Sequence, residues 1–266
     1  MPVIASRGAS ARGARTAPRV IRATAAGAAV VAVLLSGAAT AGAQAPPPVT
    51  TGERPIGAAP TDKKAFTARV LLPTVGRAAP SNRARVTQRI SPYAPYDNDP
   101  QILLVLETAT GPGGPWYRVL LPVRPNGTSA WVAGSALQVK ATPYRVRVRL
   151  GTRRMELLRA GRVINRWTVG VGMRAYPTPT GLFAISEVVP QPNPRGFFGP
   201  FILTLSAHSD QLTDFDRGEG QVAIHGTNLP GLLGGAVSHG CVRVANTAIT
   251  KVAKLVPPGA PVEVIP

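Results

Sequence analysis

Polar and apolar residues alternate strictly in one short segment of the chain. Residues Tyr144–Leu150 read YRVRVRL, so a tyrosine, two valines and a leucine share one face and three arginines share the other. A period of two residues is the period of a β-strand that is buried on one side. The segment therefore predicts a half-buried strand, whose arginine face we expect to be solvated.

Short apolar runs flank this segment on both sides. FTARVLL, QILLVLE, PWYRVLLPV and SAWVAG precede it, with the turn-forming residues GPGG (Gly111–Gly114) and PNG (Pro125–Gly127) between them. MELLRAG and RVINRWTVGVG follow it, after the turn GTRRM. Runs of this length, bounded by Gly, Pro and Asn, are typical of strands joined by tight turns. The pattern predicts a mainly β protein.

One segment near the C-terminus has helical spacing instead. In NTAITKVAKLVPPG, which begins at Asn246, apolar residues recur three or four positions apart. Asn is a favoured N-cap residue, and the two prolines that close the segment cannot continue a helix. We expect one or two short helices, of which this one is capped by the Asn246 side chain and has an apolar face formed by Ala248, Ile249, Val252 and Leu255.

The first 45 residues differ in composition from the rest. Residues 1–22 hold five arginines and no acidic residue, and an apolar run rich in alanine and glycine continues to Ala45. A basic stretch, an apolar stretch and closing small residues such as Ala43-Gln44-Ala45 are typical of a cleaved export signal. The apolar run is also long enough to cross a bilayer, so an uncleaved anchor is the alternative. Both interpretations place the rest of the chain outside the cytoplasm.

Composition and patterning divide the remaining chain into three regions. Residues 46–64 are rich in Pro and Gly and lack periodicity, which predicts a disordered linker because such a segment buries too little surface to offset its ordering entropy. Residues 65–141 carry the first strands, and Trp116–Val139 resembles the bacterial SH3-like module, a small β-barrel in which Trp116 and Trp131 would pack. Residues 143–266 form a second domain.

Basic residues outnumber acidic ones. The chain has 30 Lys and Arg against 12 Asp and Glu, which gives a formal net charge of +18. Such a charge favours anionic partners, among them nucleic acid, lipid head groups and cell-wall polymers. Export argues against nucleic acid, and the arginines are scattered rather than interleaved with aromatic residues as in a nucleic-acid groove. Lipid head groups and cell-wall polymers stay open as partners, with a merely solvated basic surface as the alternative.

Two of the three histidines and the only cysteine lie in one glycine-rich stretch, AIHGTNLPGLLGGAVSHGCVRVAN (Ala223–Asn246). A single cysteine in an exported chain cannot form an internal disulfide, so it is buried and inert, intermolecular, or reactive. A nearby imidazole can take the proton of a thiol, and backbone N–H groups of a tight turn can stabilise the resulting oxyanion. The GLLGG stretch would let the chain bend so that His225 returns to Cys241.

Metal binding is an alternative for these residues. Zinc takes three or four protein ligands, and only His208 or an acidic residue of DQLTDFDRGEG could complete a set with His225, His239 and Cys241. We expect no metal. We also expect no cofactor, because the glycines of GVGMRAYPTPTGLFAI lack the third glycine and the helix of a dinucleotide site.

The stretch IHGTNLPGLLGGAVSHGCVRVAN, with TPTGLF upstream and PPGAPVEVI at the end, resembles the catalytic domain of the L,D-transpeptidases, the YkuD family of peptidoglycan cross-linking enzymes. The resemblance spans about residues 143–266, and its Ser-His-Gly-Cys-x-Arg motif is highly specific. It implies a β-sandwich domain in which the cysteine lies on a loop beneath a flap.

The resemblance also implies a role for each residue of the motif. Cys241 would be the nucleophile and His225 the general base, with the carbonyl group of Gly226 orienting the imidazole. His239 would support the oxyanion, whose donors would be the backbone N–H groups of Gly240 and Cys241. The other motif residues are expected at the substrate or in the loop: Ser238, Thr227, Asn246 and Arg243, the last of which holds a carboxylate or the loop, or forms a surface salt bridge.

The implied reaction has two steps. The thiolate attacks the carbonyl of the third residue of a tetrapeptide stem and releases D-alanine, and the side-chain amine of a second stem then resolves the thioester to form a 3→3 cross-link. The enzyme would act as a monomer on peptidoglycan stem peptides. Two alternatives stay open: a sortase, although it lacks the SHGC motif, and a non-catalytic wall-binding protein that uses its SH3-like module.

Overall fold

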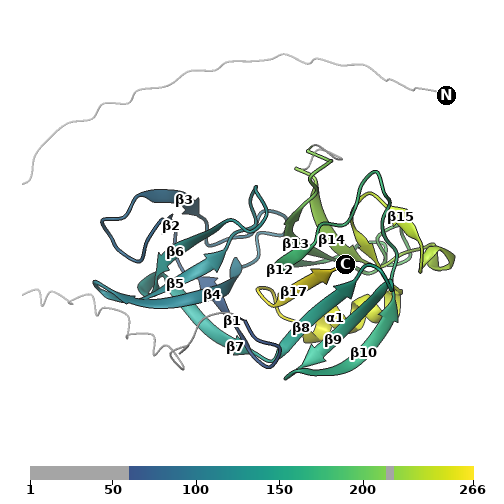
Figure 1. The fold of residues 1–266 in the computed structure, drawn as a ribbon, viewed down its shortest axis with the longest axis horizontal. Coiled ribbons are helices and arrows are strands. Elements are labelled where there is room, and N and C mark those ends of the chain that lie inside the picture. The colour runs from purple at the N-terminus through teal and green to yellow at the C-terminus, as the bar shows by residue number, and fades with distance from the viewer. Residues whose placement is uncertain (1–59, 214–218) are drawn as a thin grey trace, which may run out of the picture. The chain divides into compact units, whose positions relative to one another are not determined.

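About half of the described residues lie in β-strands, and only short segments are helical, which confirms the mainly β fold predicted from the alternating pattern (Figure 1). The structure is a computed structural model that describes residues 60–213 and 219–266. The predicted export signal and residues 46–59 of the predicted linker lie outside the described residues. Within the described residues, no helix combines the length and the apolarity that crossing a bilayer requires.

Seven strands form the first sheet, in the order β3-β2-β6-β5-β4-β1-β7 with antiparallel pairing. The expected turn GPGG joins β4 to β5, and Trp116 is buried in β5. The SH3-like assignment of this sheet stays a prediction. The strands are β1 (Ala65–Val70), β2 (Thr74–Arg77), β3 (Val86–Ile90), β4 (Ile102–Gly111), β5 (Gly114–Leu120), β6 (Ser129–Ala133) and β7 (Leu137–Thr142), with a short 3-10 helix at Gly134–Ala136.

Eight strands form the second sheet, in the order β10-β9-β8-β17-β12-β13-β14-β16. The last strand, β17, lies in the middle, parallel to β8 and antiparallel to β12. Strands β11 and β15 form a separate two-stranded parallel sheet. The strands are β8 (Tyr144–Arg149), β9 (Arg154–Arg159), β10 (Arg162–Thr168), β11 (Val171–Gly172), β12 (Gly181–Pro190), β13 (Phe201–His208), β14 (Gln221–His225), β15 (Ala236–Ser238), β16 (Val242–Arg243) and β17 (Pro261–Ile265), with a 3-10 helix at Pro230–Leu232.

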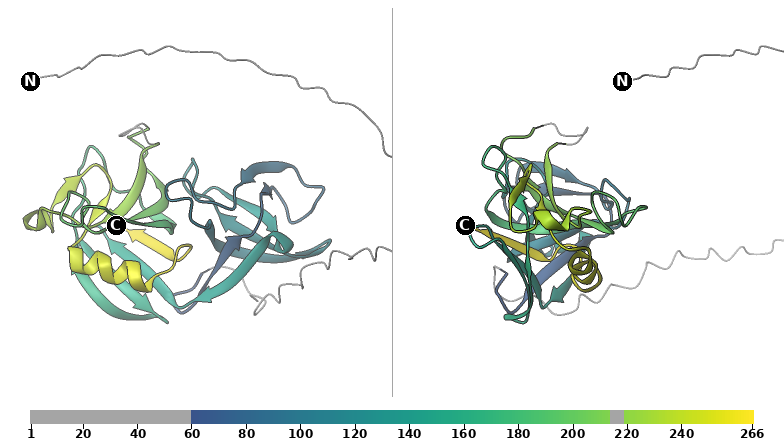
Figure 2. Two further views of the ribbon diagram at one scale, coloured as in Figure 1. Left: turned by 180° about the vertical axis from the view of Figure 1, so that it is seen from behind. Right: turned by 90° about the vertical axis from the view of Figure 1, so that its right-hand side faces the viewer.

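Helix α1 (Asn246–Leu255) packs on the second sheet against β13 and β14 (Figure 2). The apolar face read from the sequence is the face that it buries, apart from the partly exposed Leu255. The core between helix and sheet includes Leu205, Ile224 and Ile249, all fully buried. Burial of each such side chain contributes about 1.5–3 kcal/mol to the free energy of unfolding.

The predicted cap of this helix is wrong. The N-cap position is occupied by Ala245, and no side chain caps the helix. The Asn246 side chain is instead engaged elsewhere: its Oδ1 accepts a hydrogen bond from the backbone N–H of Thr227 at 2.8 Å. This long-range contact holds the amide oxygen at Thr227, away from the first turn of its own helix.

The expectation of a solvated arginine face on β8 is also wrong for Arg145, which is only 5% exposed. Its Nη2 donates to the carbonyl oxygen of Pro60 at 3.0 Å, and the neighbouring Arg147 pairs with Glu263 at 2.6 Å and with Asp62 at 2.9 Å. Buried cations need such partners, because burial without them carries a large desolvation cost. The last residues of the predicted linker are therefore held against β8.

A turn that follows β5 holds the segment that leads into β14. Arg124 donates to the carbonyl oxygens of Ser209 at 2.8 Å and Leu212 at 2.9 Å. Asn126 pairs with both backbone groups of His208, at 2.7 and 2.8 Å. The first sheet thus fixes the end of β13 and the start of the connection to β14.

Candidate functional site

Parallel pairing of β14 with β16 brings His225 and Cys241 together. His225 is the last residue of β14, and Cys241 immediately precedes β16. The register pairs Ile224 with Val242 and His225 with Arg243. Parallel neighbours need a long connection, which here is the glycine-rich stretch between the two residues. The residues between His225 and Cys241 therefore form the crossover connection between two parallel strands.

Both residues line one cavity of about 480 Å³, which we call the cysteine cavity. Its wall is completed by two aromatic side chains of the segment before β13 and by the residues around the cysteine: Phe197, Phe198, Ser238, His239 and Arg243. The ring of Phe198 lies edge-on to the His225 imidazole at 5.1 Å between centroids. We call the segment of residues 197–199 the flap segment, after the flap that the family resemblance implies.

The flap segment packs closely against the Asn246 side chain, where Gly199 and Gly226 leave room for its amide oxygen. A Cβ on Gly226 or on Gly199 would collide with Oδ1 of Asn246, and Gly199 also has a φ of +66°, which favours glycine. The same Oδ1 holds the N–H of Thr227. The sequence placed Thr227 at the substrate and Asn246 at the substrate or in the loop. Neither lines the cysteine cavity, and the contact between them agrees with the loop role for Asn246.

The imidazole of His225 has a fixed orientation. Its Nδ1 lies 2.6 Å from the carbonyl oxygen of Gly226, as the resemblance implied, so Nδ1 carries the proton and Nε2 is left as the acceptor. Burial, assisted by the charge of Arg243, lowers the pKa of His225 to about 4, although the bond to Gly226 works in the opposite direction. The ring is therefore neutral at neutral pH and can accept a proton.

The thiol of Cys241 is protonated at rest. Burial raises its pKa above the ordinary value, and a hydrogen bond with the Ala223 backbone and the charge of Arg243 only partly oppose this. A neutral thiol thus lies with a neutral imidazole in one cavity, rather than a preformed thiolate–imidazolium pair. Such a thiol becomes nucleophilic when the base takes its proton during the attack.

The loop that carries the cysteine is closed by Ser238. Its hydroxyl donates to the carbonyl oxygen of Cys241 at 2.5 Å and accepts from the N–H of Gly240 at 3.2 Å. Gly240 has a φ of +118°, which a residue with a side chain rarely adopts. The Gly240 N–H, one of the two expected oxyanion donors, is therefore bonded to Ser238 in this structure.

Thr178 is a site residue to which the sequence assigned no role. Its buried hydroxyl accepts from the N–H of Gly172 at 2.9 Å and donates to the carbonyl oxygen of Gly240 at 2.8 Å. It ties the turn before Cys241 to β11. The TPTGLF stretch contained the signal, but the spacing along the chain could not show which residue the hydroxyl would meet.

Replacing Thr178 by valine should lower the free energy of unfolding by ~1–3 kcal/mol, because two buried backbone groups lose their partner while the volume stays the same. Urea denaturation measures this loss. The matched control is Thr180→Val, two positions away and exposed, which should leave the free energy unchanged. Equal effects of the two variants would contradict the bridging role.

His239 lies at the rim of the cysteine cavity. Its side chain is exposed, and its ring lies 5.0 Å from that of Tyr176. Arg243 lies deeper and is 8% exposed, with its guanidinium 4.8 Å from the centre of the Phe197 ring. Arg243 forms no salt bridge within the described residues, and its Nε has no hydrogen-bond partner there. The surface salt bridge considered for it is therefore wrong.

The described residues contain no group of three or more His, Cys, Asp and Glu side chains that could hold a metal ion. His208, considered above as a zinc ligand, is the last residue of β13. The arrangement found in the cysteine cavity is instead one of a thiol, an oriented base and an unpaired cation, which suits acyl transfer from a substrate that carries a carboxylate.

Comparison with known families matches residues 143–264 to the YkuD L,D-transpeptidase catalytic domain. The YkuD protein of Bacillus subtilis strain 168 is 32% identical over 151 residues, which cover 54% of this chain and 84% of the relative. The YkuD protein of Bacillus licheniformis is 37% identical over 124 residues, which cover 47% of this chain and 67% of the relative. The chain belongs to the YkuD family of L,D-transpeptidases. The family resemblance seen in the sequence is confirmed, and the sortase alternative is wrong.

The YkuD match begins at the residue before β8 and thus covers the second sheet, not the first. Solved structures that are similar to the chain include an L,D-transpeptidase from Mycobacterium tuberculosis, at 14% identity and a TM-score of 0.41, with 74% of this chain and 95% of that chain covered. The Enterococcus faecium L,D-transpeptidase C442S mutant is 21% identical with a TM-score of 0.34, and 46% of this chain matches 50% of that chain.

Proposed function

We propose that this YkuD-family protein is an exported peptidoglycan L,D-transpeptidase that forms 3→3 cross-links through a thioester on Cys241. The observation that carries the proposal is the cysteine cavity, in which a thiol and an oriented neutral imidazole lie beside an unpaired arginine. The family supports the substrate class, and the geometry of the cavity supports the residue roles.

The first step forms the thioester. The Cys241 sulfur attacks the carbonyl carbon at the L-centre of the third stem residue while its proton passes to Nε2 of His225. The N–H of Cys241 donates to the oxyanion that develops. The peptide bond to the terminal D-alanine then breaks, and the imidazolium returns the proton to the departing amine.

The second step transfers the acyl group. The side-chain amine of a second stem attacks the thioester carbonyl, the bond to sulfur breaks, and the amine proton passes through His225 back to the sulfur. The energy of the original peptide bond is kept in the thioester, so no nucleotide is consumed. The neutral state of His225 suits both proton transfers, because a base must be unprotonated before each attack.

Arg243 is proposed to bind the carboxylate of the terminal D-alanine. A buried guanidinium with an unpaired Nε is electrostatically costly, and a substrate carboxylate would satisfy it. Its position in the wall of the cysteine cavity leaves its charge facing the bound donor. Stacking on Phe197 would hold the guanidinium plane in place.

The place of action and the partners are part of the same proposal. The arginine-rich start and the apolar run that follows favour export, which would deliver the enzyme to the wall. The basic composition suits an anionic polymer. We propose that the protein acts as a monomer and that the first sheet accompanies the catalytic sheet at the wall, rather than acting as a wall-binding module alone.

The test of the reaction is to identify its product. The full chain is incubated with a disaccharide-tetrapeptide, and the mixture is analysed by tandem mass spectrometry. We expect loss of D-alanine and a dimer whose fragments place the new bond between two third residues. Release of D-alanine without any dimer would contradict cross-link formation, and binding without turnover would favour the wall-binding alternative.

Replacing Arg243 by glutamine should lower kcat/KM for the tetrapeptide donor by about 10–100-fold, because a charge-assisted hydrogen bond to the carboxylate is lost. A donor whose terminal carboxylate is a carboxamide should lose no more than about twofold in the same variant. D-Alanine or D-alaninamide release, followed by mass spectrometry, measures both. Equal losses for the two donors would show that Arg243 shapes the cavity without binding the carboxylate.

A further inference from the structure

A second cavity shares Phe198, His225 and Cys241 with the cysteine cavity and extends away from them. It has a volume of about 240 Å³ and runs from Cys241 and His225 over β14, β13 and β12 to Tyr96. Tyr96 lies in the connection between β3 and β4 of the first sheet. The register places Glu187 opposite Thr204 and Thr204 opposite Ala223, beside the cysteine. With strands about 4.8 Å apart, Glu187 lies about 10 Å from Ala223 across the sheet.

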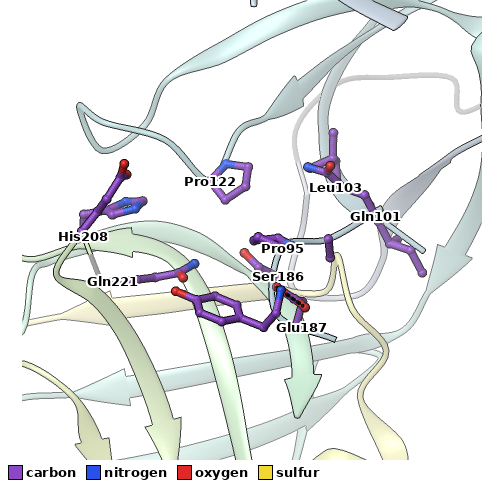
Figure 3. Close-up of a pocket in the computed structure, with 12 residues that line it drawn as sticks. Pro95, Gln101, Leu103, Pro122, Ser186, Glu187, His208 and Gln221 are labelled. Atoms are coloured by element: carbon purple, nitrogen blue, oxygen red, sulfur yellow. Dashed lines mark hydrogen bonds between the residues drawn. The ribbon is translucent and has the colours of Figure 1, made fainter. Parts of the chain in front are cut away.

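A third cavity adjoins this passage where the two sheets meet, and we call it the junction cavity. It has a volume of about 360 Å³. Figure 3 shows His208 and Gln221 on one side of it, with Gln101 and Leu103 on the opposite side. Two of its residues, Tyr96 and Gln221, also line the passage to Cys241. Its polar side chains are those of Tyr96, Ser186, Glu187, His208, Glu219, Gln221 and Gln101.

Glu187 is fixed in the wall of the junction cavity. Its buried carboxylate accepts hydrogen bonds from the backbone N–H groups of Tyr96 at 3.2 Å and Asp97 at 3.1 Å. Burial raises the pKa of its carboxyl group, and the nearby Asp97 and Asp99 raise it further, although the two hydrogen bonds oppose the rise. A cation bound beside this carboxylate would relieve the repulsion between the three acidic groups.

His208 lines the same cavity and has an unpartnered ring nitrogen. Its side chain is only 3% exposed, and its Nδ1 has no hydrogen-bond partner within the described residues. The ring has a hydrogen bond with the Ser206 backbone, and burial together with the charge of Arg124 lowers its pKa. In the neutral ring, with the proton on Nε2, the unpartnered Nδ1 is an acceptor. A buried polar atom of this kind calls for a donor from a ligand.

Two further residues of the junction cavity, Gln221 and Glu219, also offer hydrogen-bond acceptors. Gln221 donates one amide N–H to the carbonyl oxygen of Leu205, which leaves its amide oxygen and its second N–H for a ligand. Glu219 adds a second carboxylate at the exposed side. None of the described lining residues is a lysine or arginine, although such residues are abundant in the chain. Arg124, whose charge acts on His208, donates to the backbone carbonyl oxygens of Ser209, Leu212 and Glu219.

We propose that the junction cavity binds a protonated primary amine and so concentrates the amine-bearing acceptor near Cys241. The ammonium group releases its extra proton to solvent, and the neutral amine then reaches the thioester through the adjoining passage. An ammonium group has three donors and a positive charge, which match two carboxylates, an imidazole nitrogen and an amide oxygen. The recruiting role rests on the proposed function. In this role Tyr96, from the connection between β3 and β4, contributes to acceptor selection by the catalytic domain.

Binding is tested without any need for turnover. The full chain with Cys241→Ala is titrated with n-butylammonium chloride, with n-butanol and sodium butyrate as uncharged and anionic probes of equal length, and backbone amide NMR shifts of Tyr96 and Gln221 are followed. We expect saturable shifts with the ammonium probe alone. The Kd should rise at least about tenfold in Glu187→Gln and in Glu219→Gln, because a charge-assisted contact is lost.

Both cavity variants should fold, so a loss of binding can be assigned to the lost charge. Glu187→Gln retains an oxygen for the Tyr96 and Asp97 N–H groups, and Glu219 is exposed, so both should fold, as near-ultraviolet circular dichroism checks. Glu107→Gln removes an exposed carboxylate of β4, outside the cavity, and should leave the Kd unchanged. Ammonium binding that equals n-butanol binding, or that survives both cavity variants, would overturn the proposal.

Recruitment is tested separately, by aminolysis of the acyl-enzyme. The KM for n-butylamine should rise at least about tenfold in Glu219→Gln, whereas the KM for hydroxylamine, which is uncharged at pH 7.5, should stay unchanged. An unchanged KM for n-butylamine would overturn the recruiting role. If the wild-type chain forms no acyl-enzyme, the proposed function fails, and the NMR titration still decides whether the cavity binds an amine.

Discussion

Replacement of Cys241 by alanine should reduce D-alanine release from a tetrapeptide donor by on the order of 10⁴-fold or more, because no other thiol exists in the chain to form the thioester. Intact-mass spectrometry should show an acyl adduct on the wild-type protein and none on the variant. D-Alanine release, measured with a coupled D-amino acid oxidase assay, quantifies the loss.

The variant should stay folded, since alanine fills nearly the same space and the loop is held by the Ser238 and Thr178 hydrogen bonds. An unchanged urea midpoint checks this. Arg69→Gln, an exposed arginine of β1, serves as the control that should retain full activity. Residual turnover of Cys241→Ala above a few per cent would exclude the thioester mechanism.

Replacement of His225 by glutamine should lower kcat/KM by ~10²–10⁴-fold, the usual contribution of a general base. Since the pKa of His225 is lowered to about 4, the wild-type enzyme should lose activity only as the pH falls towards 4, rather than near the ordinary histidine value. A pH profile of kcat/KM measures this. An acid limb centred near pH 6.5 would contradict a buried neutral imidazole as the base.

The same shift makes stability depend on pH. Between pH 6.5 and about 4 the unfolded chain binds a proton at His225 that the folded chain does not, so the free energy of unfolding falls as the pH is lowered through this window. The full difference amounts to ~3 kcal/mol. Urea titrations across this range should show the loss in the wild type and a smaller loss in His225→Gln. Identical slopes would mean that His225 is accessible to protons in the folded state.

Sequence patterns predicted those features that depend on local spacing. The alternation in Tyr144–Leu150 gave a strand, and the helical spacing after Asn246 gave a helix at that position, because both signals arise within a few residues. The motif around Cys241 was specific enough to indicate the family. These patterns could not predict side-chain partners. Arg145 donates to the Pro60 carbonyl oxygen, which precedes β1, and Asn246 accepts from Thr227, on the far side of a crossover connection.

The parts of the site that the sequence missed are those built by distant segments. Thr178 meets Gly240 from 62 residues away, and Tyr96 meets Glu187 from 91 residues away. No periodicity relates such positions. The commitment of the Gly240 N–H to Ser238 was also hidden, because a motif names residues but does not state which donor each hydroxyl will hold.

The central place of β17 has a consequence for synthesis and proteolysis. β8 and β12 are each paired with β17, and it is β17 that joins the three strands β10-β9-β8 to the four strands that carry His225 and the flank of Cys241. Until residues 261–265 have left the ribosome, the nascent chain holds two half-sheets with exposed edges and no way to dock one on the other. Removal of these few residues by a carboxypeptidase would likewise divide the catalytic sheet, although every residue of the cysteine cavity would still be present.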